Sequence, residues 1–144
     1  MIQNSEKSNS MIIHLSAFAK YIIPLGSILL PLILWQTTKK DSDFIDHHGK
    51  EAVNFNISFL LYNLVCVFLL FGSLFGTIFN AIQAEDIVDD AEILGILFGT
   101  GGFITAIIVL STISIVKLIL MILASVRANE GKLYKYPLTI RFIR

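Results

Sequence analysis

Residues 52–84 read AVNFNISFLLYNLVCVFLLFGSLFGTIFNAIQA and contain no Asp, Glu, Lys, Arg or His. A second run without these residues covers 93–116. An uncharged, mainly apolar run of about 18 residues or more can cross the ~30 Å hydrocarbon core of a bilayer as a helix. A surface helix of a water-soluble protein would carry charged residues on its outer face. The sequence therefore predicts an integral membrane protein.

The composition points the same way. Hydrophobic residues make up 55% of the 144 residues, and the mean hydropathy is +0.75. A further apolar segment, residues 13–35, contains Pro24 and Pro31 and is expected to form a kinked helix. We therefore expect an all-α fold with a single polytopic membrane domain over residues 1–144. It would have three transmembrane helices at roughly 13–35, 57–81 and 94–118, the second and third forming a hairpin, and short interfacial segments. A polar tail at 1–11 and a basic, aromatic tail at 127–144 would flank them.

The basic residues are distributed unevenly along the chain. Residues 36–50 hold three and residues 127–144 hold five, whereas the loop EDIVDDAE at 85–92 holds five acids and no base. Lys and Arg concentrate in cytoplasmic loops. Three helices then predict a bacterial inner-membrane protein with its N-terminus outside and its C-terminus in the cytoplasm. The net charge is zero, so the charge balance gives no reason to expect nucleic acid as a partner.

A polar stripe runs along the start of the second predicted helix. At 100° per residue, four polar residues fall within about 60° of Glu51 and form the stripe with it: His47, Asn54, Ser58 and Tyr62. Polar side chains of a transmembrane helix usually face other helices or water rather than lipid. We expect this region to contact other helices or partner proteins, with Lys117 of the third helix either reaching the membrane surface or pairing with Glu51. The candidate contact residues are His47, His48, Lys50, Glu51, Asn54, Ser58, Tyr62 and Lys117.

The same block raises the possibility of metal chemistry. His47 and His48 lie three or four residues from Glu51, which brings them close on a helix. Structural zinc sites use four protein ligands and catalytic ones usually three, and the remaining histidine, His14, would lie across the membrane in a three-helix arrangement. Motifs for hydrolases and for phosphate-binding loops are absent from the sequence. We expect no catalytic residue, no cofactor and no metal, with a metalloenzyme that uses His47, His48 and Glu51 as an alternative.

Two glycine pairs flank the acidic loop. GSLFG supplies Gly72 and Gly76, and GILFG supplies Gly95 and Gly99. Small residues four apart let helices approach closely in lipid. We expect these glycines to pack the helical hairpin, with association of two copies as the alternative. Gly49 is expected to end the preceding loop and allow the second helix to start.

The chain ends in ANEGKLYKYPLTIRFIR, residues 128–144. Basic and aromatic residues at a membrane edge usually anchor a chain at lipid headgroups. Tyr134, Tyr136, Pro137 and Arg141 are therefore predicted interface anchors. A strand that docks onto a partner is the alternative.

Several stretches resemble a known family. They are HLSAFAKYIIPLG, PLILW, FIDHHGKEAVNFNISFLLY and ANEGKLYKYPLTIRF. Together they resemble small bacterial membrane proteins of unknown function that are grouped with the Tic-twenty-like proteins, which are named for a chloroplast inner-envelope import component. The resemblance covers about residues 11–144, and residues 48–55 and 134–138 are its most specific parts. It implies a channel or a translocation component.

We therefore expect a non-enzymatic inner-membrane protein that acts as an accessory or scaffold subunit of a larger membrane complex. Its partners would be the lipid bilayer and other membrane proteins or copies of itself. The alternative is a channel or protein-translocation component lined by the polar stripe.

Overall fold

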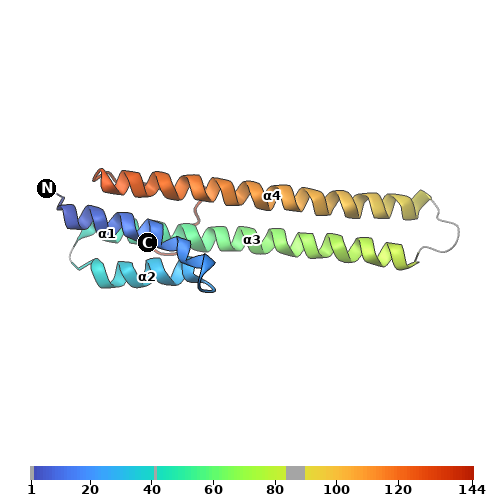
Figure 1. Ribbon diagram of the computed structural model, residues 1–144, viewed down its shortest axis with the longest axis horizontal. Coiled ribbons are helices and arrows are strands. Elements are labelled where there is room, and N and C mark those ends of the chain that lie inside the picture. Colours follow the sequence, from blue (N-terminus) through green and yellow to red (C-terminus); the bar gives the residue numbers. More distant parts are fainter. Residues whose placement is uncertain (1, 41, 84–89) are drawn as a thin grey trace. The chain divides into compact units, whose positions relative to one another are not determined.

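The computed structural model describes residues 2–40, 42–83 and 90–144, and its regular elements are helices (Figure 1). In chain order they are α1 (Asn4–Leu15), the 3₁₀ helix η1 (Ser16–Tyr21), α2 (Gly26–Thr38), α3 (Asp43–Gln83) and α4 (Asp90–Asn129). No β-strand occurs in the described ranges, so the prediction of an all-helical protein is confirmed. The chain divides into two units. The first unit is Met1–Leu60 with Val116–Arg144, and the second unit is Leu61–Ile115.

Two of the helices are long and apolar enough to cross a membrane. These helical stretches are Asp43–Phe79 and Ile93–Asn129, of 37 residues each. The predicted spans 57–81 and 94–118 lie within α3 and α4. Both helices are longer than the predicted spans, since α3 begins at Asp43 and α4 ends at Asn129. Residues 43–48, which were expected to belong to the loop before the second helix, are therefore helical.

The first predicted span, residues 13–35, does not form one helix. α1 ends at Leu15, and α2 begins only after η1 and a turn at residues 22–25. Pro24 cannot donate a backbone hydrogen bond, and Leu25 adopts a left-handed backbone with φ of 58°. The 13 residues of α2 extend over only about 20 Å at 1.5 Å per residue, less than the ~30 Å of a hydrocarbon core. The segment therefore breaks where a kink was expected, and a count of three spans is not confirmed.

The second unit pairs parts of α3 and α4 at their small residues. The Ser73 hydroxyl donates a hydrogen bond to the carbonyl oxygen of Gly99. A Cβ added to Gly99 would overlap the Thr77 side chain, and one added to Gly102 would lie 2.8 Å from Ser73 Oγ. The two helices are therefore close enough at this point that a side chain would separate them.

Two of the other predicted packing glycines have open space where a side chain would be. A Cβ added to Gly72 or Gly76 would meet no atom within 4 Å. Gly95 is half-buried. Among the described neighbours, the close approach of α3 and α4 is therefore seen at Gly99 and Gly102.

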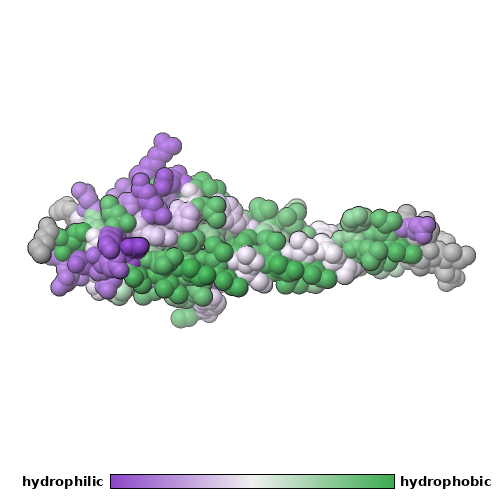
Figure 2. All heavy atoms as spheres, turned by 90° about the horizontal axis from the view of Figure 1, so that it is seen from above, coloured by the Kyte–Doolittle hydropathy of each residue, from purple (hydrophilic) through white to green (hydrophobic). Residues whose placement is uncertain are grey.

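The surface of the second unit suits contact with lipid. Apolar side chains cover much of it (Figure 2), and Phe68, for example, is 79% exposed. Hydroxyl groups on this surface are satisfied within their own helix, because Thr105, Ser111 and Thr112 each donate to the carbonyl four residues earlier. Hydrophilic side chains gather instead on the first unit (Figure 2).

The core of the first unit forms where α1 and α2 pack on the start of α3. Ile13, Trp35, Ile45 and Val53 are buried together there. The Trp35 indole donates to Asp46 Oδ1 over 3.0 Å. Gly49 lies inside α3, not at its start, and a Cβ at this position would overlap ring atoms of Trp35. Its missing side chain therefore makes room for the tryptophan.

We expect Gly49→Ala to lower the free energy of unfolding by about 1–3 kcal/mol, because the added methyl group must displace the Trp35 ring from a packed core. The measurement is the thermal unfolding midpoint in mild detergent, followed by the fluorescence of Trp35, the single tryptophan. Gly72→Ala is the matched control. Its Cβ meets open space, so it should be neutral or stabilising by up to about 1 kcal/mol. Equal loss in both variants would contradict the assigned role of Gly49.

Candidate functional site: a polar stripe bound by the C-terminal tail

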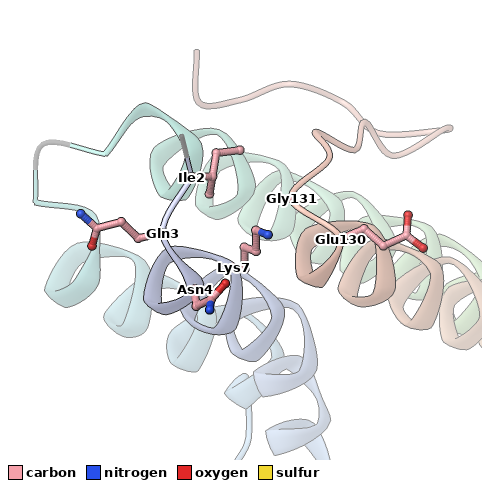
Figure 3. A pocket seen from close by; sticks show the side chains of 6 residues that line it. All are labelled: Ile2, Gln3, Asn4, Lys7, Glu130 and Gly131. Carbon is pink, nitrogen blue, oxygen red and sulfur yellow. The ribbon is translucent and has the colours of Figure 1, made fainter.

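A glycine turn ends α4 and redirects the chain. The Gly131 N–H donates to the Ala128 carbonyl and the Lys132 N–H donates to the Arg127 carbonyl, the pattern of a Schellman motif. Gly131 has φ of +76°, which a glycine adopts without strain. The Lys7 side chain of α1 lies against this turn (Figure 3), where its charge is favourable beside the carbonyl end of α4. The turn and Lys7 thus join α1 to the end of α4.

The tail beyond this turn, residues 132–144, first binds the start of α3. His47 Nε2 and the carbonyl oxygen of Tyr134 lie 3.2 Å apart, with the imidazole as donor. The Tyr136 N–H donates to Glu51 Oε2 over 2.9 Å. Arg141 Nε lies 3.4 Å from Glu51 Oε1, and the Glu51 side chain is only 6% exposed. One buried carboxylate therefore holds two parts of the tail.

The tail then reverses at residues 137–138 and binds α3 again. Leu138 has a left-handed backbone with φ of 58°. Beyond this turn the Ile140 N–H donates to Ser58 Oγ over 2.9 Å. Asn54 Oδ1 accepts the N–H groups of Phe142 and Ile143 at 3.1 and 2.9 Å, and Asn54 Nδ2 donates to the Ile143 carbonyl over 2.8 Å. Asn54 thus bonds to three backbone groups of the tail.

The polar stripe of α3 therefore has an occupant within its own chain. His47, Glu51, Asn54 and Ser58 each bond to the tail's backbone. The tail has no regular secondary structure, so its N–H and C=O groups depend on such side chains once water is excluded. Tyr62, at the far end of the predicted stripe, belongs to the second unit.

Three segments of the first unit meet at a buried group of aromatic side chains. His14 Nε2 lies 2.8 Å from His48 Nδ1, and the Tyr136 hydroxyl lies 3.0 Å from His14 Nδ1. The Tyr136 ring stacks on Phe55, with ring centroids 3.8 Å apart. His14, His48 and Tyr136 are all at least 96% buried. α1, α3 and the tail are thus joined by one chain of hydrogen bonds, and Tyr136 lies in this core instead of at lipid headgroups.

Burial keeps this group neutral. It lowers the pKa of His14 to about 3, with smaller contributions from the charges of His48 and His47. Burial also raises the pKa of Tyr136 well above its ordinary value of 10, so the hydroxyl stays protonated. One arrangement satisfies both nitrogens of His14: the Tyr136 hydroxyl donates to Nδ1, and Nε2–H donates to His48 Nδ1.

The outer nitrogen of His48 is less well satisfied. A polar backbone group of Lys132 lies close to the ring but outside hydrogen-bond geometry, so His48 Nε2 has no hydrogen-bond partner among the described residues. His47, His48 and Glu51 bond to different partners and do not converge on one point. Within the described ranges no three His, Cys, Asp or Glu side chains are placed to hold one metal ion.

Of the charged candidates near the stripe, Glu51 has an ion-pair partner other than the expected Lys117. The ion pair predicted between Glu51 and Lys117 is not among the ion pairs of the described residues, and Arg141 lies beside Glu51 instead. Lys117 is buried in α4. Lys50 pairs with Asp46 of the same helix over 2.6 Å.

Sequence reasoning missed the role of His14. A three-span count assigns it to the opposite side of the membrane from His48, and the 2.8 Å contact between them does not fit that placement. Pro24, which ends the helical path before α2, was the signal that the first segment need not cross the membrane. Proline-induced breaks and kinks look alike in a sequence, so the signal was not decisive.

We expect Ser58→Ala to increase the exchange rate of the Ile140 amide hydrogen and to lower the free energy of unfolding by about 1 kcal/mol, because it removes the acceptor of that N–H. Asn54→Leu removes three bonds to the tail and should cost about 2–3 kcal/mol and expose residues 140–144 to carboxypeptidase. Ser114→Ala is the control, since among the described residues Ser114 donates to the Leu110 carbonyl of its own helix and not to the tail. An unchanged Ile140 exchange rate in Ser58→Ala would show that the tail is not held there.

Comparison with known proteins identifies the family. A model of the MamF/MmsF family, described as the magnetosome magnetite crystal formation protein family, matches residues 5–143. No curated protein and no solved structure matches the chain. The match covers α1 to α4 and the tail, so it includes the polar stripe and the segment that binds it. The resemblance to the Tic-twenty-like proteins is therefore wrong, and the chain belongs to the magnetosome magnetite crystal formation protein family.

Proposed function

We propose that this protein is a non-enzymatic membrane subunit that supports magnetite crystal formation, acting as an accessory or scaffold protein for other membrane proteins of the magnetosome. Membership of the family supports the setting. The observation that carries the non-enzymatic reading is the occupied stripe: the most polar surface of α3 bonds to the chain's own tail. Polar side chains used in this way position a segment rather than a substrate.

The same observation weighs against the two other candidate functions. A channel lined by the stripe would need its polar side chains open to water, and Asn54 and Ser58 are buried beneath the tail. A metalloenzyme would need His47, His48 and Glu51 to converge, and each bonds to a different partner. A scaffold needs neither.

We further propose that the first unit faces the cytoplasm. All eleven Lys and Arg residues of the chain fall within it, which favours the cytoplasmic side. The contact between His14 and Tyr136 holds α1 and the tail together, and α3 and α4 then cross the membrane as a pair. Both ends of the chain would lie in the cytoplasm. The acidic loop, whose residues 85–89 are outside the described ranges, would face the opposite side.

Reporter fusions test this orientation. Green fluorescent protein fused at either end should fluoresce, and alkaline phosphatase inserted after Asp86 should be active, because the first folds in the cytoplasm and the second outside it. Alkaline phosphatase fused at either end should be inactive. An active N-terminal phosphatase together with a fluorescent C-terminal fusion would restore the three-span arrangement.

The role in crystal formation is tested in a magnetite-forming host that carries this chain. Cells that lack the chain should form crystals of altered size or number by electron microscopy, the Ser114→Ala variant should restore them, and Asn54→Leu should restore them poorly. Gentle detergent extraction should recover the protein with other membrane proteins. Normal crystals in cells without the chain would refute the crystal role. Altered crystals with a protein that purifies alone would refute the scaffold role.

A further inference from the structure

The docked tail and the start of α3 enclose a polar groove of about 490 Å³ in the first unit. Its wall on the α3 side includes Asp43, Asp46, Lys50 and Glu51, and the tail contributes three bases. The groove exists only because the tail lies on α3, since its two walls are more than 80 residues apart in the sequence. Those three bases are Lys135, Arg141 and Arg144.

The acids of the groove are largely neutralised. Asp46 pairs with Lys50 over 2.6 Å. Glu51 accepts the Tyr136 N–H and lies beside Arg141 Nε. Of the three acids, only Asp43 has no ion pair in the described part of the chain. A cation would therefore find little unpaired negative charge in the groove.

The bases of the groove are less fully used. Lys135 and Arg144 are exposed and form no ion pair among the described residues. Arg141 engages Glu51 only through Nε, so its two terminal nitrogens can still donate, and its side chain is 52% exposed. A guanidinium with two parallel donors suits the oxygens of a phosphate group. The charges that remain available therefore favour an anion.

The depth of the groove points to a lipid as the source of that anion. Lys50 and Glu51 are the last charged residues before the uncharged run 52–84, which places them at the boundary between hydrocarbon and water. Exposed apolar side chains on the tail, those of Leu138, Ile140 and Phe142, lie beside Arg141 in the sequence. A ligand with a phosphate and acyl chains would meet both.

We propose that this groove binds the phosphate-containing headgroup of an anionic phospholipid, with Arg141, Arg144 and Lys135 as donors. The bound lipid would rest on the tail only while the tail is docked on α3. This site is separate from the proposed scaffold role and does not depend on it. Free phosphate shares the headgroup's chemistry but lacks acyl chains, so the experiment includes both.

The test uses the full-length protein in a neutral detergent, with native mass spectrometry to count bound lipids. Short-chain phosphatidylglycerol should bind at least about fivefold more tightly than the matching phosphatidylcholine. Lys135→Gln combined with Arg144→Gln should reduce this preference to less than about twofold. Lys39→Gln combined with Lys40→Gln removes the same charge from the same unit outside the groove and should leave the preference unchanged. Far-ultraviolet circular dichroism checks that each variant is folded, because Lys39 lies over the Trp35 ring and its removal would alter the tryptophan fluorescence directly.

Three outcomes would overturn the proposal. An equal loss of preference in the control pair would show that binding follows net charge and not the groove. Competition by inorganic phosphate at the same concentration as the lipid would identify a free-anion site. An unchanged preference in Lys135→Gln with Arg144→Gln, and also in Arg141→Gln, would show that the lipid binds elsewhere.

Discussion

The structure depends on how an irregular backbone obtains hydrogen bonds next to a membrane. The hydrocarbon core of a bilayer offers no donors or acceptors, so non-helical backbone is tolerated there only where protein satisfies it. Residues 132–144 form such a segment, and they follow α4, a helix long and apolar enough to cross a membrane. Asn54 and Ser58 supply bonds that a neighbouring strand would supply in a sheet. Polar residues that look like a site are thus required by the fold.

The buried group of His14, His48 and Tyr136 joins its segments without burying a charge. Charged pairs in a low-dielectric interior carry a desolvation penalty that their attraction often fails to offset. Here two imidazoles and a phenol join three segments while remaining neutral. The buried Glu51 carboxylate, by contrast, bonds to a backbone N–H and lies beside an arginine. This one buried carboxylate is therefore compensated by the two parts of the tail that it holds.

The sequence was informative where one physical effect dominates. Uncharged runs predicted the two long helices, because an apolar segment of this length can cross a bilayer as a helix, and the period of the polar residues placed Glu51, Asn54 and Ser58 on one face. The occupant of that face could not be derived. The tail binds the stripe through backbone groups, which nearly all residues carry, and an irregular segment shows no periodic pattern in its sequence. Neither property marks residues 132–144 as the segment that binds there.

The break near Pro24 shows a second feature that the sequence alone could not predict. Proline kinks some membrane helices and ends others, and only the left-handed Leu25 and the packing of Trp35 in the space at Gly49 decide which occurs here. That packing joins residues of two helices through a missing side chain. A sequence reading that treats Gly49 as a helix start therefore loses both the helix boundary and the tertiary contact.

The distance along the chain between α3 and the tail has a consequence for synthesis. Ser58 is translated more than 80 residues before Ile140, whose N–H it accepts. At an elongation rate of up to about 20 residues per second, the stripe waits several seconds for the segment that covers it. During that interval the side chains of Glu51, Asn54 and Ser58 lack the tail N–H groups that they accept in the folded protein. The nascent protein therefore needs water or an insertion factor at this face until residues 134–143 have left the ribosome and can bind.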